Sequence, residues 1–141
     1  MSLAYLESKR EHPARTAAMK SIAAVQGKDR EAWLAMWHDD GLLQDPVGIS
    51  PLDPEGKGHR GIAAITEFYD NVIAQGDVRF HIRESFAAGD ECANVGTITT
   101  RGADGSVARC ELVMLYRVDA HGKVLSLRAF WEFDDMMAGY F

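Results

Sequence analysis

The sequence has little cysteine, no long apolar run and no excess of positive charge. Only two of its 141 residues are cysteines, which excludes a fold held together by disulfides. No stretch approaches the ~20 apolar residues that a membrane-spanning helix requires, and no apolar signal segment follows the first basic residues. Lys and Arg number 15 against 21 Asp and Glu. We therefore expect a cytoplasmic protein with neither a nucleic-acid nor a membrane partner.

What remains is the composition of an ordinary globular protein. Hydrophobic residues make up 47% of the chain and charged residues 26%, which excludes a disordered or collagen-like chain. A chain of this length folds as one domain with a packed core. We expect a single domain over residues 1–141, with an ordered core at about 13–133 and a C-terminal tail at 134–141.

The first half of the chain has the periodicity of three helices. Apolar and small residues recur at three- and four-residue intervals in residues 13–26. Asp29 is a plausible N-cap for a second, short helix that carries Trp33 and Trp37 on its apolar face. A third helix is predicted over residues 62–73, where apolar side chains again recur at helical spacing.

The second half of the chain has the period of β-strands. A Gly- and Pro-rich loop at 48–61 separates the last two helices, and its length is typical of functional loops. Beyond it, alternation predicts four strands, at 79–83, 92–100, 106–118 and 123–133. A turn centred on Asp104 would place Cys110 near Ile98, which leaves Cys92 too far away for a disulfide. Helices followed by an antiparallel meander define an α+β fold.

The last two strands also carry apolar residues on the face that points away from the core. By parity, Val113, Leu115 and Phe130 lie on this face among charged residues. A fully solvated sheet surface carries fewer apolar side chains. The pattern therefore predicts a homodimer formed through the outer face of the sheet.

Matches to nucleotide and metal motifs lack the context that they need. Residues 56–61 have the spacing G-x-G-x-x-G, but they follow a loop with two prolines instead of a strand. The consecutive residues His38, Asp39 and Asp40 would face different directions at a helix end, so they do not form a metal site. His59 lies in the predicted loop with no partner. No metal or nucleotide cofactor is expected.

Asp45 is a carboxylate in an apolar and rigid segment. It follows Leu42 and Leu43 closely, and Pro46 holds it in an extended conformation. Partial desolvation raises the pKa of a carboxylate and makes it a better proton acceptor, which suits a general base. The alternative is a turn or capping residue before proline, and the residue pattern alone favours that alternative.

Three segments, in the same order along the chain, resemble the bacterial ketosteroid isomerases, also called steroid Δ-isomerases. These segments are Gln44–Gly48, Gly61–Tyr69 and Gly122–Ala129. The resemblance extends over about residues 16–133. The helix start Asp29–Trp33 and the segment Asp135–Met137 are similar in particular to actinobacterial ketosteroid-isomerase-like proteins.

The resemblance implies the cone-shaped fold of the nuclear transport factor 2-like and SnoaL-like superfamily. In this fold a strongly curved antiparallel sheet wraps around three helices and encloses a deep apolar pocket. The resemblance also implies a homodimer and a hydrophobic, steroid-like small molecule as the ligand. No cofactor is implied, because proton transfer within one substrate needs no electron carrier.

The resemblance also assigns candidate site residues. The family's proton-transferring aspartate falls on Asp45, which becomes the expected catalytic base. An indole N–H from Trp131 would orient this base and keep it ionised. The expected substrate-binding residues are Ser21, Trp37, Phe68, Leu112, Met114, Leu127, Ala129 and Trp131.

Two departures from the family concern the oxyanion hole, which there consists of a tyrosine and a protonated carboxylic acid. Ser21 stands where the tyrosine belongs, and Met114 stands where the acid belongs. The loss of one such donor costs about 10²- to 10³-fold in rate. Tyr116 lies one pleat from Met114 on the same face and is the candidate catalytic substitute, although packing as a core aromatic is an equal alternative.

Three functions stay open on these grounds. The first is an isomerase that moves a proton next to the carbonyl of a steroid-like or polyketide-like ketone. The second is a non-catalytic binding protein for a hydrophobic small molecule. The third is a polyketide cyclase or an epoxide hydrolase of the same fold, because fold alone does not determine activity.

Overall fold

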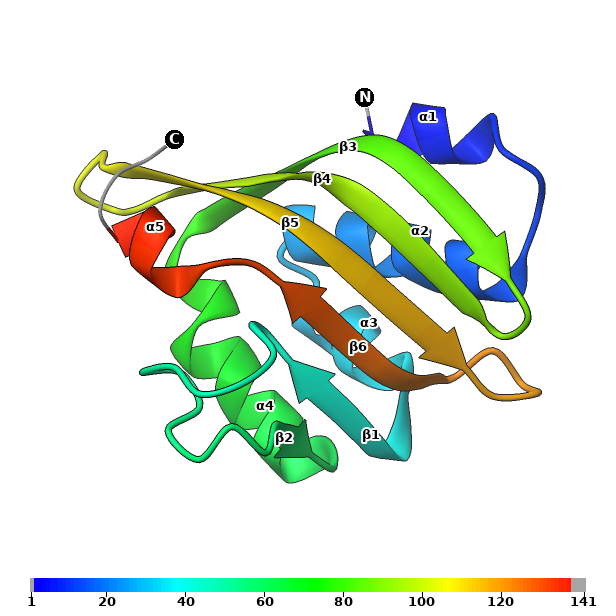
Figure 1. The fold of residues 1–141 in the computed structure, drawn as a ribbon, viewed down its shortest axis with the longest axis horizontal. Helices are drawn as coiled ribbons and strands as arrows, with labels where there is room; N and C mark the ends of the chain where they lie inside the picture. Colours follow the sequence, from blue (N-terminus) through cyan, green and yellow to red (C-terminus); the bar gives the residue numbers. More distant parts are fainter. Residues whose placement is uncertain (1, 138–141) are drawn as a thin grey trace.

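The structure is a computed structural model that describes residues 2–137, and it contains one curved sheet with helices against one face (Figure 1). The sheet has the strand order β2-β1-β6-β5-β4-β3. Its strands are β1 (Trp37–Gln44), β2 (His59–Arg60), β3 (Asp77–Ala88), β4 (Glu91–Arg101), β5 (Val107–Val118) and β6 (Val124–Phe130). The α+β class predicted from the sequence is confirmed.

The helices fill the concave side of the sheet and its open end. They are α1 (Ser2–Glu7), α2 (Pro13–Gln26), α3 (Arg30–Ala35), α4 (Ile62–Asn71), the 3₁₀ helix η1 (Ile73–Gln75) and α5 (Phe133–Met137). The Asp29 side chain caps α3 as predicted, because it accepts a hydrogen bond from the backbone N–H of Ala32 at 3.1 Å. In the described part of the chain, no helix combines the length and hydropathy that crossing a bilayer requires.

The sheet is mixed, whereas we expected an antiparallel one. β1 pairs with β6 in parallel, with Leu43 opposite Leu127 and Gln44 opposite Arg128. The other strand pairs are antiparallel. β1 also begins at Trp37, inside the segment predicted to continue the second helix. An alternating strand and the last turn of a short helix look alike over so few residues, and nothing local in β1 indicates its partner.

The N-terminal segment contributes to the core, which we expected to begin at about residue 13. In α1, only 1% of the surface of Leu6 is exposed, and this helix packs on β3 and α2. At the other end, α5 occupies the first part of the expected tail, and residues 138–141 lie outside the described residues.

The curvature of the sheet has a local cause in β3 and β4. The register between these strands shifts between Ile82 and Glu84, so Arg83 is an extra residue in β3. A bulge of this kind bends its strand. Gly96 stands opposite the bulge, where an added Cβ would lie 2.3 Å from the carbonyl oxygen of His81. Glycine therefore permits the close approach at the bend that bounds the interior.

The burial of Leu6 leads to a prediction about stability. Replacing Leu6 by alanine removes a fully buried side chain, so we expect Leu6→Ala to lower the free energy of unfolding by about 2–5 kcal/mol. Glu7→Ala, in the same helix but exposed, should change it by less than about 0.5 kcal/mol. Urea denaturation measures both. Equal effects would show that α1 does not belong to the cooperative core.

Candidate active site

A cavity of about 370 Å³ lies between the concave face of the sheet and helices α2, α3 and α4. This volume falls within the range of small-molecule sites, and aliphatic and aromatic side chains form most of the wall. Most of the predicted site residues line it, namely Ser21, Asp45, Phe68, Met114, Tyr116, Leu127, Ala129 and Trp131. The cavity thus joins residues from α2, α4, β5, β6 and the segment after β1.

Trp37 and Leu112, predicted to bind substrate, do not line this cavity. Trp37 lies behind Trp33, with the two rings edge-on and their centroids 5.5 Å apart. Leu112 is buried opposite Gly96 and borders a hollow on the outer side of the sheet. Trp37 therefore packs against the wall residue Trp33, whereas Leu112 is buried without contributing to the wall. Alternation along a strand and resemblance to a family assign a side chain to the inside of the fold. They do not distinguish a side chain that lines the cavity from one that packs elsewhere in the core.

Asp45 and Trp131 come together where β1 and β6 end. Because these strands run in parallel, the residues that follow them lie at the same edge of the sheet, and the backbone N–H of Val47 donates to the carbonyl oxygen of Ala129 at 2.9 Å. There the indole Nε1–H of Trp131 donates to Oδ1 of Asp45 at 2.5 Å. Among the described residues, no other side chain hydrogen-bonds to this carboxylate.

The environment of Asp45 shifts its protonation equilibrium. Burial against the apolar wall is the largest influence and raises the pKa of the carboxyl above its ordinary value. The Trp131 hydrogen bond and the nearby His59 ring oppose this shift, because both favour the charged form. The result is a carboxylate with a raised pKa, which makes it a stronger base than an exposed aspartate.

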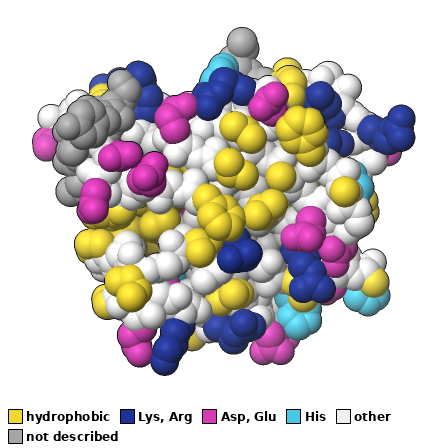
Figure 2. All heavy atoms as spheres, viewed as in Figure 1, with side chains coloured by type: hydrophobic (Ala, Val, Ile, Leu, Met, Phe, Trp, Pro, Cys, Tyr) yellow, Lys and Arg dark blue, Asp and Glu magenta, His cyan; other side chains and the backbone are white. Residues whose placement is uncertain are grey.

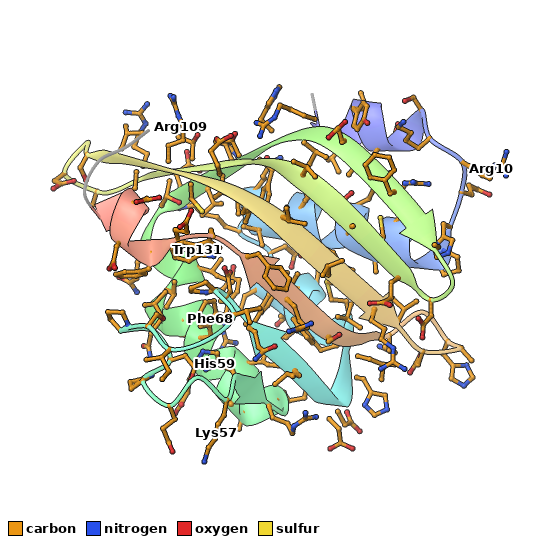
Figure 3. All side chains as sticks on the ribbon, viewed as in Figure 1. Arg10, Lys57, His59, Phe68, Arg109 and Trp131 are labelled. Carbon is orange, nitrogen blue, oxygen red and sulfur yellow. The ribbon has the colours of Figure 1, made fainter. Side chains whose placement is uncertain are left out.

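We expected His59 to lie in a loop, and this was wrong. It lies on β2, opposite Leu43 in the register, and its ring packs on Phe68 of α4 with centroids 4.9 Å apart (Figure 3). Its Nε2 atom is buried and has no hydrogen-bond partner in the described part of the chain. A strand of two residues is too short to show alternation, so no sequence signal revealed this placement.

A second polar group lies on the cavity wall between α2 and β5. The Tyr116 hydroxyl donates to Oγ of Ser21 at 3.0 Å, and the indole N–H of Trp33 donates to the same oxygen at 3.1 Å. All three side chains line the cavity and are almost fully buried. Burial raises the pKa of the Tyr116 hydroxyl, so this group stays protonated and can donate a hydrogen bond.

The remaining titratable group of the wall is the thiol of Cys110. Burial, followed by the charges of Asp45 and Glu111, raises the pKa of this thiol to about 12, so it stays neutral and unreactive at physiological pH. Both cysteines are free. Within residues 2–137, no group of three His, Cys, Asp or Glu side chains is arranged to hold a metal ion.

This combination of a curved open sheet, an apolar cavity and a half-buried aspartate beside an indole defines a class of protein. Residues 19–127 match the SnoaL-like domain family, which covers most of the chain. The protein belongs to the SnoaL-like family, within the nuclear transport factor 2-like fold that the sequence resemblance implied.

The chain is also similar to three proteins for which a name or a bound ligand is known. The steroid Δ-isomerase of Nocardioides simplex is 31% identical over 123 residues, which covers 87% of this chain and 93% of the relative. A Δ5-3-ketosteroid isomerase from Mycobacterium sp. superimposes with a TM-score of 0.84 at 36% identity, over 88% of this chain and 96% of that chain. RV0760c from Mycobacterium tuberculosis, solved in complex with estradiol-17β-hemisuccinate, has a TM-score of 0.83 at 32% identity, over 88% and 97%.

The raised pKa of Asp45 predicts how stability depends on pH. Because folding raises this pKa, the carboxyl stabilises the fold when protonated, and that contribution is lost as the pH rises above about 4. We therefore expect Asp45→Asn to be more stable than the wild type at pH 7 and to match it near pH 3. Urea denaturation at both pH values measures the difference.

Asp70 provides a control of opposite sign. The guanidinium of Arg30, which donates to Asp70 at 2.8 Å, lowers the pKa of this exposed carboxyl. Asp70→Asn should therefore leave the protein slightly less stable than the wild type at pH 7, with the difference lost as the pH falls. If Asp45→Asn behaved in the same direction as Asp70→Asn, burial would not dominate the pKa of Asp45.

Proposed function

We propose that this protein is an isomerase of steroid-like ketones in which Asp45 is the catalytic base. The observation that carries the proposal is the Asp45 carboxylate itself, set in the wall of an apolar cavity and held at one oxygen by Trp131. No described side chain hydrogen-bonds to Oδ2, and we propose that this oxygen acts on a ligand in the cavity that Asp45 lines. The similarity to two steroid Δ-isomerases supports the reaction, and a relative with a bound steroid derivative supports the ligand class.

In the proposed reaction, Oδ2 of Asp45 takes a proton from the carbon next to the ketone. The C–H electron pair forms a new C=C bond, and the carbonyl π electrons move to the ketone oxygen, which gives a dienolate. Asp45 then returns the proton to the far carbon of the C=C bond already present in the substrate, whose π electrons form the new C–H bond, while the other C=C bond moves next to it and the C=O bond forms again. The proton and all electrons stay within the substrate and the base, so the reaction is balanced without an oxidant.

The dienolate oxygen needs a hydrogen-bond donor, and Tyr116 with Ser21 is the candidate. Residue 21 is a serine, but the phenol of Tyr116 enters from β5 and brings a second hydroxyl to it. We propose that this pair stabilises the oxyanion in place of the tyrosine and acid of the family. Because the site has one donor instead of two, we expect turnover to be slower by about 10²- to 10³-fold than in relatives with both donors.

One observation favours a second candidate function, a steroid-binding protein without turnover. The side chain of Met114 lies in the wall at the position of the family's acidic donor, and a thioether has no proton to donate. A cavity with a base but too weak an oxyanion site would bind the ketone and release it unchanged.

Enone formation tests the base. Asp45→Asn removes the proton acceptor but keeps an oxygen for the Trp131 hydrogen bond, so kcat/KM for a Δ5-3-ketosteroid should fall by about 10²- to 10⁴-fold. The rise in ultraviolet absorbance of the conjugated product measures it. Asp70→Asn, a carboxylate on the surface, is the matched control.

The outcomes distinguish the two candidate functions. Turnover that survives in Asp45→Asn would refute the assignment of the base. Tight binding of equilenin to the wild type without any turnover would instead favour the binding protein. Loss of turnover in Asp45→Asn with equilenin binding retained would support the isomerase.

We also propose that the protein is a homodimer through the outer face of the sheet. Figure 2 shows hydrophobic side chains gathered in the middle of this face, with charged side chains around them. A hollow of about 540 Å³ lies there, bordered by Val95, Val113 and Phe130 and by the ion pair of Arg83 with Glu111. A second copy would cover these apolar side chains and would place the charged pairs at the rim.

The dimer proposal is tested by the molecular mass in solution. A charge at the centre of the patch would have to be buried without a partner, so Phe130→Asp should give a monomer in sedimentation equilibrium. Ile49→Asp places the same charge on an exposed apolar residue that does not border the hollow, and this variant should stay a dimer. A monomeric wild type would refute the proposal.

A further inference from the structure

The Trp33, Ser21 and Tyr116 cluster has one more proton than it has internal hydrogen bonds. The indole N–H and the two hydroxyls supply three protons. Two hydrogen bonds connect the groups, one from Trp33 to Ser21 and one between Tyr116 and Ser21. Reversing the direction of the bond between the hydroxyls does not alter this count. One O–H proton is therefore left over in either arrangement.

That spare proton has no acceptor within the described residues. A helical serine often donates to the carbonyl oxygen four residues earlier, as Thr66 does to Ile62 at 2.7 Å, but Ser21 makes no such bond to Ala17. Ser21 is 2% exposed and Tyr116 is 1% exposed, so water outside the fold does not reach them. A buried donor without an acceptor is costly, and the open side of this cluster is the cavity.

Trp33 fixes which lone pair of Ser21 is occupied. Its ring is held from two sides, by Trp37 at 5.5 Å and by Tyr69 at 5.3 Å between centroids. The indole N–H therefore has little freedom to turn away from Oγ of Ser21. Because this bond occupies the oxygen from the α3 side, the hydroxyl proton of the pair is directed elsewhere, and the bond also polarises it as a donor.

We propose that Trp33, Ser21 and Tyr116 form a single-donor site for a ligand oxygen, in which Trp33 is a positioning residue that aims the donated O–H into the cavity. The site selects ligands that carry a hydrogen-bond acceptor, a ketone above all, at the end that reaches α2. It rests on the proposed function for the identity of the ligand, but it makes a claim about binding that does not depend on Asp45 or on turnover.

The test compares two ligands that differ in one oxygen, 5α-androstan-3-one and 5α-androstane. Binding of each is measured by displacement of the fluorescent steroid equilenin. The ratio of the two dissociation constants measures the contribution of the ketone oxygen to binding. One hydrogen bond should favour the ketone by about three- to tenfold in the wild type. Ser21→Ala combined with Tyr116→Phe removes every hydroxyl of the cluster, so the ratio should fall to about one.

Trp33 is tested with a matched pair of tryptophans. Trp33→Phe removes the N–H that holds Ser21 and should lower the preference for the ketone to less than half of the wild-type ratio. Trp37→Phe keeps an aromatic ring against Trp33 and removes an Nε1–H that has no hydrogen-bond partner in the described part of the chain, on a side chain outside the cavity wall. It should cost stability but leave the ratio unchanged. The infrared C=O stretch of the bound ketone should move to higher wavenumber in Trp33→Phe only.

Each failure has a distinct meaning. A wild type without preference for the ketone, or a double variant that keeps the preference, would overturn the donor site. Equal ratios in Trp33→Phe and Trp37→Phe would overturn the positioning role of Trp33. None of these results depends on the enone assay, so the single-donor site could fail while Asp45 is upheld as the base, and the reverse also holds.

Discussion

The Asp45 carboxylate is a charged group in the wall of a mostly apolar cavity, and the contacts around it offset the free-energy cost of its desolvation. Burial of an unpaired carboxylate is costly, and the molecule offsets the cost with the Trp131 indole and the nearby His59 ring. The Trp131 bond exists because β1 and β6 run side by side in the same direction and end at the same edge. The ionisation of one side chain therefore depends on the pairing of two strands.

The two polar sites of the cavity have opposite chemical character. The Asp45 site offers a proton acceptor, whereas the cluster of Trp33, Ser21 and Tyr116 offers a donor. The wall between them is mostly apolar, so in the proposed complex the ligand would be oriented by which of its ends can lose a proton and which can accept a hydrogen bond. Apolar burial supplies affinity in such a cavity, and the few polar groups determine orientation.

Much of the fold follows from local patterns in the sequence. The helix at 13–26, the Asp29 cap and the strands β3 to β6 were predicted from periodicity and turn residues, although the predicted strand 79–83 covers only part of β3 and the predicted strand 123–133 runs past the end of β6 at Phe130. The predicted turn centred on Asp104 also gave the correct register, in which Cys110 pairs with Ile98. In these cases the residues that determine the structure are neighbours in the chain, so their spacing carries the information.

The parts that were not predicted depend on distant contacts. Nothing near β1 indicates that its partner is β6, and the two residues of β2 are too few to show a period. The same holds for the site. The candidate base and its indole were predicted from a family resemblance, but the role that we propose for Trp33 depends on a hydrogen bond between α3 and α2. The helical spacing of Trp33 in the sequence is that of any core residue, so it does not indicate that the indole N–H has a hydrogen-bond partner.

The bond between Asp45 and Trp131 joins residues 86 positions apart in the chain, and this has a consequence during protein synthesis. The ribosome releases β1 long before β6, so the growing chain holds β1 beside only the two-residue strand β2. Until the last strand arrives, β1 and β5 both present an open edge, which is the kind of surface that aggregates. Over the same interval the carboxylate faces water and is an ordinary weak base. A nascent chain of this protein therefore lacks the Asp45–Trp131 hydrogen bond and exposes two aggregation-prone strand edges until β6 and Trp131 have emerged.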